Sequence, residues 1–150
     1  MTAPTQNGEL WMGHYCNKLD LGAAQSPRYV VVLSVYEGKY LLSRHKERST
    51  WETQGGHIEP GETPLEAAKR ELYEESGAVG FDIVPLFDYE AGDRIGSATG
   101  VVFCAHITEL GCIPDSEMAE VQTFAALPQE LTYPNITPHL FRWAEEMQAF

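Results

Sequence analysis

Apolar residues along this chain fall into short runs that predict a β-sheet. Runs rich in valine, leucine, isoleucine and aromatic residues have the length and composition of strands. They cover residues 29–36, 39–43, 81–88, 101–107 and 121–125. Only Glu37 and Gly38 separate the first two runs, which is the length of a tight hairpin turn. We therefore expect a sheet whose first two strands form a hairpin.

A helix is predicted between residue 63 and Gly77. The segment 63–66 (TPLE) has the form of a capping box, with proline at the first helical position. Gly77 is a typical C-terminal stop. On a helix, Leu65, Ala68 and Leu72 fall within one narrow arc, so we expect these three side chains to form the buried stripe.

The two ends of the chain differ in pattern. Residues 138–150 have the period of an amphipathic terminal helix. Residues 1–26 show no clear period and are interpreted as an irregular N-terminal extension, anchored by Trp11 and Tyr15. Because no repeat, low-complexity tract or linker interrupts the chain, we interpret residues 1–150 as a single α/β domain.

The composition is that of a globular protein with a strong acidic excess. Hydrophobic residues make up 43% of the 150 residues, enough for one core. The 22 acidic and 10 basic residues give a net charge of −12. Such a surface repels a phosphate backbone, so generic nucleic-acid binding is not expected. A small anionic substrate is still permitted where divalent cations sit among clustered carboxylates.

Targeting and redox signals are absent from the sequence. No apolar run approaches the ~20 residues that a membrane-spanning helix requires. The first nine residues lack the apolar core of a signal peptide. The 3 cysteines have no C-x-x-C spacing, which argues against a disulfide framework and a zinc site. We expect a cytoplasmic protein without a membrane partner, present as a monomer or homodimer.

Three glutamates share one side of the predicted helix. Glu71 and Glu75 lie four residues apart beside the apolar stripe, and Glu74 lies further round, so the three carboxylates span roughly 100° of helix surface. A solvated acidic face is the alternative for any glutamate-rich helix. The position of these acids beside the core, after a glycine turn that carries Glu62, favours a site for Mg²⁺ or Mn²⁺ instead.

Residues 56–78 (GHIEPGETPLEAAKRELYEESGA) resemble the Nudix box, G-x5-E-x7-R-E-U-x-E-E-x-G-U, where U is a bulky aliphatic residue. Every fixed position matches, and only Ala78 is smaller than the usual final aliphatic. On these residues the chain is identified as a MutT-like member of the Nudix hydrolase family. The resemblance implies a Nudix-type α/β/α sandwich with a central mixed β-sheet and Mg²⁺-dependent cleavage of a phosphoanhydride bond.

The resemblance also assigns roles to particular residues of the box. It implies that Glu71, Glu74 and Glu75 bind divalent metal and position or activate water. The backbone carbonyl of Gly55 is expected to complete the coordination, and Arg70 is expected to hold a glutamate in place.

Residues on both sides of the box extend the resemblance. Gln54 stands where many members have proline, and Glu62 is expected to support the loop or the metal shell. A further acid often comes from a downstream loop or strand, and Glu117 and Glu120 precede the strand at 121–125. We prefer Glu120 as a base and metal ligand because it stands just before the aliphatic start of that strand. Exposed loop acids are the alternative for both.

Arg44, Arg48 and Trp51 are the candidate substrate-binding residues. The segment 44–48 (RHKER) is the only basic concentration in the chain, and it would either contact phosphates or keep a loop soluble. Trp51 and Tyr89 are candidates for stacking on a base, although packing in the core is the commoner role of such aromatics.

The expected substrate is a nucleoside diphosphate joined to another group. Residues 93–95 (DRI) carry neither the proline common in ADP-ribose hydrolases nor the tyrosine common in dinucleoside polyphosphate hydrolases, and the coenzyme A signature is missing. This favours a nucleoside triphosphate, oxidised forms included, cleaved to nucleoside monophosphate and pyrophosphate. Hydrolysis of ADP-ribose, a nucleotide sugar or a dinucleoside polyphosphate is the alternative.

Two other proteins with this fold are weighed against hydrolysis. An isopentenyl-diphosphate isomerase would use a catalytic cysteine, and Cys104 does lie near His106, but such isomerases have a degraded box. A non-catalytic nucleotide-sensing module would have lost a metal glutamate. The intact box disfavours both.

Overall fold

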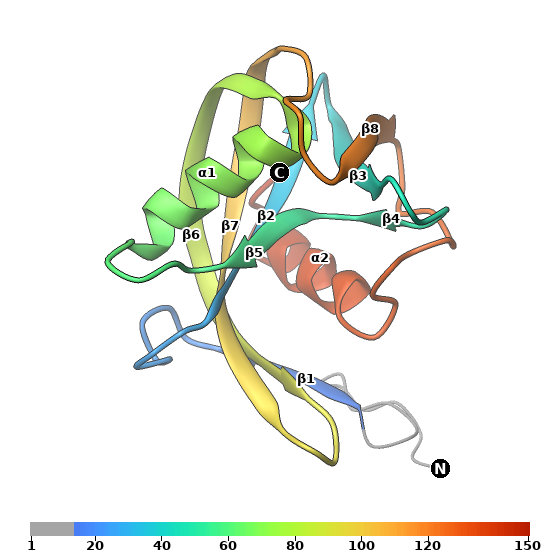
Figure 1. The fold of residues 1–150 in the computed structure, drawn as a ribbon. Coiled ribbons are helices and arrows are strands. Elements are labelled where there is room, and N and C mark those ends of the chain that lie inside the picture. Colours follow the sequence, from blue (N-terminus) through green and yellow to red (C-terminus); the bar gives the residue numbers. More distant parts are fainter. Residues whose placement is uncertain (1–13) are drawn as a thin grey trace.

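The structure is a computed structural model that describes residues 14–150, so the expected anchor Trp11 lies outside the described residues. The strands are β1 (Tyr15–Leu19), β2 (Tyr29–Tyr36), β3 (Lys39–His45), β4 (Trp51–Glu52), β5 (Gln54–His57), β6 (Ala78–Gly92), β7 (Ser97–Leu110) and β8 (Met118–Phe124). The helices are α1 (Pro64–Ser76) and α2 (Thr137–Glu146). Figure 1 shows the long twisted hairpin of β6 and β7 passing between the two helices.

The strands form one mixed sheet in the order β1-β6-β7-β2-β3-β4, with β5 also paired to β2 and β8 to β3. β2 and β7 are parallel, whereas β1, β6 and β7 pair antiparallel. β2 and β7 lie at the centre and are covered on both faces, which explains why their sequences are continuous apolar runs rather than alternating ones.

Two strands share the edge of β2 that faces away from β7. β5 pairs with residues 29–32 of β2, and β3 pairs with residues 34–36. The sheet therefore forks after Val32. Glu37 and Gly38 between β2 and β3 have φ values of 52° and 78°, the left-handed conformation of a two-residue hairpin turn. The predicted hairpin is confirmed.

The two helices cover opposite faces of the sheet. One buried cluster joins α1 to the sheet and includes Val30, Val32, Ala68, Leu72 and Phe103. The other joins α2 to the sheet and includes Leu33, Leu42, Val102, Leu140 and Phe141. This arrangement confirms the predicted α/β/α sandwich (Figure 1).

The buried stripe of α1 differs from the predicted one at its first position. Ala68 and Leu72 are buried as predicted, but Leu65 is 39% exposed and Ala67 is buried instead. Leu65 shares the arc of Leu72 and Ser76 but stands in the first turn, at the end of the helix, whereas the buried residues of α1 begin at Ala67.

The N-terminal segment is not wholly irregular, as the sequence pattern had suggested. Residues 15–19 form β1, which pairs antiparallel with Asp88–Gly92 of β6, and Cys16 is completely buried. Of the five residues YCNKL only Cys16 is buried, in the cluster that joins α2 to the sheet, so the segment shows no run of alternating apolar positions. Among the described residues, no helix is long and apolar enough to cross a membrane.

Candidate active site

Two glycines place β5 against β2 and α1. A Cβ on Gly55 would overlap the carbonyl oxygen of Val30, so only glycine allows this approach of the two strands. A Cβ on Gly56 would lie 2.7 Å from Oε1 of Glu71. The glycine pair therefore lets a helix carboxylate reach the backbone of β5.

The helix that carries the acids is capped at both ends as the sequence predicted. The Thr63 hydroxyl accepts from the Glu66 N–H at 3.1 Å, and the Glu66 carboxylate accepts from the Thr63 N–H at 2.9 Å. Gly77 ends the helix with φ 80° and donates its N–H to the Tyr73 carbonyl. These caps fix where the helix begins and ends, and so which way its glutamates point.

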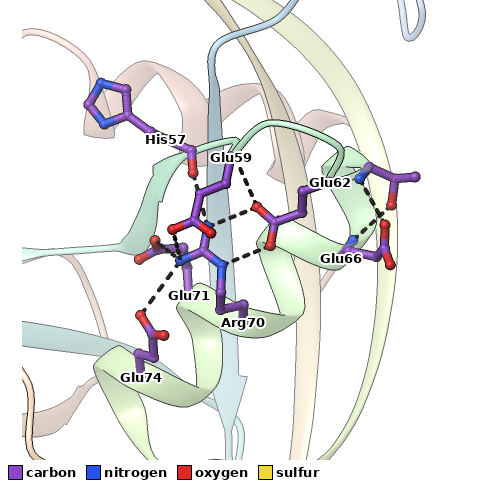
Figure 2. Close-up of polar contacts among 8 residues, drawn as sticks. His57, Glu59, Glu62, Glu66, Arg70, Glu71 and Glu74 are labelled. Atoms are coloured by element: carbon purple, nitrogen blue, oxygen red, sulfur yellow. Dashed lines mark hydrogen bonds and ion pairs between the residues drawn. The ribbon is translucent and has the colours of Figure 1, made fainter.

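Arg70 lies among carboxylates from α1 and from the loop before it (Figure 2). Its Nε and Nη2 donate to the two oxygens of Glu62 at 2.8 and 2.9 Å, and its Nη1 donates to Oε1 of Glu71 at 2.6 Å. Nη2 also donates to the His57 carbonyl at 3.0 Å. The Arg70 guanidinium lowers the pKa of Glu62 to about 2. Arg70 thus ties the loop to the helix and holds the Glu71 carboxylate.

Glu75 lies in a different environment from Glu62. Its Oε1 accepts from the Gly55 N–H at 2.7 Å. Burial raises the pKa of Glu75 to about 8; the Gly55 N–H opposes this rise, and the like charges of Glu71, Glu52 and Glu74 add to it. Burial also raises the pKa of Glu71, although Arg70 opposes the rise. The helix therefore carries two carboxylates that are crowded, half-buried and costly to ionise.

These carboxylates fit a divalent cation by their chemistry. In residues 14–150 no three His, Cys, Asp or Glu side chains are already gathered as a set of metal ligands. Glu71 and Glu75 nevertheless both reach the Gly55-Gly56 pair, and a cation between them would relieve the repulsion that raises their pKa values. Carboxylate and backbone carbonyl oxygens are the ligands that Mg²⁺ and Mn²⁺ prefer.

A cavity of about 910 Å³ opens beside this carboxylate cluster. Its near end, next to α1, is lined by Arg48, Glu52, Gly55, Gly56 and Glu75. Its wall continues over Tyr29, Tyr89 and Tyr133 to a far end lined by His14, Tyr15, Arg28, Gly92 and Ser97. The volume lies near the upper end of the ~300–1,000 Å³ typical of small-molecule sites.

The structure separates the three predicted substrate-binding residues. Arg48 lines the cavity, where Nη1 lies 3.1 Å from Oε2 of Glu52 and a hydrogen bond with Tyr133 raises the pKa of Arg48. Arg44 instead donates from Nε to Oε1 of Glu120 at 2.8 Å. Trp51 packs edge-on against Phe124, with ring centroids 5.1 Å apart, and does not line the cavity. Of the three, only Arg48 lines the cavity.

The two downstream acids also lie apart. Glu120 on β8 faces Arg44 on β3 in the sheet register and does not line the cavity. Glu117 lines the cavity, and its Oε2 lies 3.5 Å from Nε2 of His45, which lines it too. The geometry thus favours Glu117, whereas the sequence pattern favoured Glu120. The β8 pairing begins at Met118, so Glu120 belongs to a strand and Glu117 to the loop at the cavity.

Sequence reasoning did not single out several residues that line the cavity. Glu52 is 7% exposed and contributes a fourth carboxylate near Glu75. Tyr29 and Tyr133 are aromatic walls that come from separate strands and loops, and no local pattern marks them.

Comparisons with known proteins agree with this architecture. The NUDIX domain family model matches residues 25–143. A putative 8-oxo-dGTP diphosphatase of Bacillus subtilis is 46% identical over 55 residues, covering 37% of this chain and 34% of that protein. An RNA pyrophosphohydrolase of Francisella philomiragia is 38% identical over 71 residues, covering 43% of this chain and 46% of that protein.

A solved structure extends the likeness over most of the chain. The crystal structure of a Bacillus subtilis pyrophosphohydrolase superposes with a TM-score of 0.72 at 26% identity, covering 89% of this chain and 92% of the other. The chain spans less than half the length of the two curated relatives above, whereas the fold is shared nearly from end to end. With the family model matched over residues 25–143 and this fold, the chain belongs to the Nudix family.

Proposed function

We propose that this protein is a Mg²⁺-dependent pyrophosphohydrolase, with Mn²⁺ as a substitute ion, that cleaves a nucleoside triphosphate, oxidised forms included, to nucleoside monophosphate and pyrophosphate. One observation carries the proposal. Glu71 and Glu75 reach the Gly55-Gly56 pair at the near end of a cavity large enough for a nucleotide. The names of the relatives support hydrolysis of a phosphoanhydride bond.

The metal would be held by Glu71, Glu74, Glu75 and the carbonyl of Gly55. When bound, it supplies charge neutralisation for the diphosphate and a more acidic water. The protein's own part is positioning. Arg70 holds Glu71 at 2.6 Å, and the Gly55 N–H holds Glu75 at 2.7 Å, so the two carboxylates are oriented before the substrate arrives.

Arg48 is the side chain that we propose to contact the substrate phosphates. It lines the cavity beside Glu52 and is hydrogen-bonded to Tyr133, which lines the cavity too. The Tyr29 ring, paired with His57 at a centroid distance of 4.5 Å, offers an aromatic surface for the base.

Glu117 is the residue that we propose as the general base. Its carboxylate lines the cavity and is 83% exposed, so it can take a proton from an attacking water. Glu117→Gln is expected to lower kcat by at least about a hundredfold, the lower end of the effect expected for a general base. Glu120→Gln is the matched control, because Glu120 pairs with Arg44 outside the cavity. Equal losses in the two variants would contradict the assignment.

The reaction itself is tested with a substrate panel. Purified protein is incubated with nucleoside triphosphates, oxidised nucleotides, ADP-ribose, nucleotide sugars and dinucleoside polyphosphates, with Mg²⁺ and with Mn²⁺, and products are resolved by mass. We expect pyrophosphate and monophosphate from a triphosphate, and loss of turnover in Glu75→Gln. Glu109→Gln, an exposed acid of β7, is the control. Turnover that persists in Glu75→Gln would overturn the role proposed for Glu75. Nucleotide binding without any turnover would overturn the proposed hydrolysis and leave a sensing module.

A second candidate substrate, the triphosphorylated 5′ end of an RNA, is favoured by the far end of the cavity. Arg28 lies over the Tyr29 ring, 5.7 Å from its centroid, and both line the cavity. With the first base on the Tyr29 ring, the Arg28 guanidinium is placed to bind the phosphate that links the first nucleotide to a second one. A triphosphorylated dinucleotide should then be cleaved faster than the mononucleotide, and Arg28→Ala should remove the difference. Lys39→Ala, an exposed cation of the β2–β3 hairpin, is the control.

A further inference from the structure

A buried polar network fills the fork where β3 and β5 separate along the edge of β2. Gln54 is the first residue of β5 and pairs with Val32 of β2, and Ser34 begins the pairing of β2 with β3. The Gln54 amide oxygen accepts from the Ser34 hydroxyl at 2.6 Å. Its amide nitrogen donates to the Leu41 carbonyl at 3.2 Å and to the Ser43 hydroxyl at 2.9 Å. One side chain thus bridges three strands.

The network continues from the sheet to the helix that carries the acids. The Ser43 hydroxyl donates to the backbone carbonyl of Glu75 at 2.8 Å. The residue after Gln54, Gly55, donates its N–H to the Glu75 carboxylate at 2.7 Å. Neighbouring residues of β5 therefore hold Glu75 at two points, its side chain directly and its backbone through Ser43.

Every member of this network is sealed from water. Ser34, Ser43 and Gln54 are each 0% exposed. None of their side-chain oxygen and nitrogen atoms lacks a hydrogen-bond partner. A satisfied buried network of this kind allows only one arrangement, because any shift of the helix would leave a polar group unpaired in the core.

We propose that Gln54 and Ser43 are positioning residues that fix Glu75, through its backbone carbonyl, relative to the Gly55 N–H. The inference rests on the proposed function, in which Glu75 is a metal ligand. A proline, which stands at position 54 in many sequences that the box resembles, has no amide to bridge the three strands. This chain therefore sets the place of its last box glutamate with a side chain of its own.

Ser34 and Ser43 provide a matched pair for the test. Both hydroxyls are fully buried and bonded to Gln54, but only Ser43 reaches Glu75. We expect Ser43→Ala to lower kcat about tenfold and to raise the Mg²⁺ concentration for half-activation, because a small displacement of a catalytic group is costly. Ser34→Ala should change both by less than about twofold. The melting temperatures of both variants measure the stability that each loses when a buried hydroxyl bonded to Gln54 is removed.

A second pair of variants distinguishes the loss of the Ser43 hydroxyl from a general packing defect. Ser43→Thr and Ser43→Val add the same volume, but only threonine keeps the hydroxyl, so threonine should retain about tenfold more kcat than valine. In a double-mutant cycle, Ser43→Ala combined with Gln54→Met should cost no more than the larger single change, because both break one chain of contacts.

Three outcomes would overturn the inference: equal losses of kcat in Ser34→Ala and Ser43→Ala, no loss in either, or additive effects in the cycle. Failure of the proposed function would be detected with a different variant, Glu75→Gln. In that case Glu75→Gln would retain full activity, whatever the serine variants do.

Discussion

Replacing Glu75 with glutamine is expected to stabilise the protein at alkaline pH when no metal is present. Burial raises the pKa of Glu75 from 4.5 to about 8. The unfolded chain loses this proton near pH 4.5, whereas the folded chain keeps it up to about pH 8. Stability is therefore greatest below the unfolded pKa and falls as the pH rises through this window.

The size of the effect follows from the pKa difference. Each pKa unit corresponds to about 1.4 kcal/mol, so an ionised Glu75 costs on the order of 5 kcal/mol above pH 8. Glutamine keeps an oxygen for the Gly55 N–H and carries no charge, so Glu75→Gln should avoid that cost. At about pH 5 the two proteins should have similar free energies of unfolding, and at about pH 9 the variant should be more stable by several kcal/mol.

The assay is urea unfolding across this pH range, first with a chelator and then with Mg²⁺. Saturating Mg²⁺ should raise the free energy of unfolding of the wild type by about 2.7 kcal/mol at a concentration one hundred times Kd. It should leave the free energy of unfolding of Glu75→Gln unchanged. Glu109→Gln, an exposed acid, is the control for the loss of one charge. Parallel pH profiles for the wild type and Glu75→Gln would refute the reasoning.

Two further predictions concern Gly77 and Arg70 of the box, with Gly22 outside the box as a comparison. Gly77→Ala should lower the free energy of unfolding by more than about 2 kcal/mol, because φ is 80° and the new Cβ would lie 2.5 Å from the Cys112 carbonyl oxygen. Gly22→Ala, with φ 88° and open space around it, should cost about 1 kcal/mol in the same unfolding assay. Arg70→Lys should lower kcat about tenfold, because lysine keeps the charge but not the two-pronged contact with Glu62; wild-type kcat in this variant would contradict that role.

The features of this protein that are local in sequence were predictable. The α1 helix begins and ends where its capping box and Gly77 indicate, because these signals act through backbone hydrogen bonds a few residues apart. The β2–β3 hairpin followed from the length of its turn for the same reason. The spacing of Glu71 and Glu75 on one side of a helix is likewise a local property.

Features that depend on distant strands were not predictable. β1 is a strand only because β6 extends far enough to pair with it. Glu117 and Glu120 look alike in sequence, and the register of β8 against β3 decides which one faces the cavity. The sequence makes Trp51 a candidate for stacking on a base, but the Trp51 ring packs against Phe124, a residue far away in the sequence.

The parallel pairing of β2 with β7 bears on how quickly this protein can fold. It joins residues 71 positions apart, such as Tyr29 and Gly100, so closing the sheet requires a large loss of chain entropy before any contact forms. The α1 helix, by contrast, is stabilised by neighbours in sequence and can form within microseconds. During refolding, helical circular dichroism should therefore return before hydrolytic activity, since the cavity beside the glutamates is lined by residues of β6 and β7 as well as by β2 and β5.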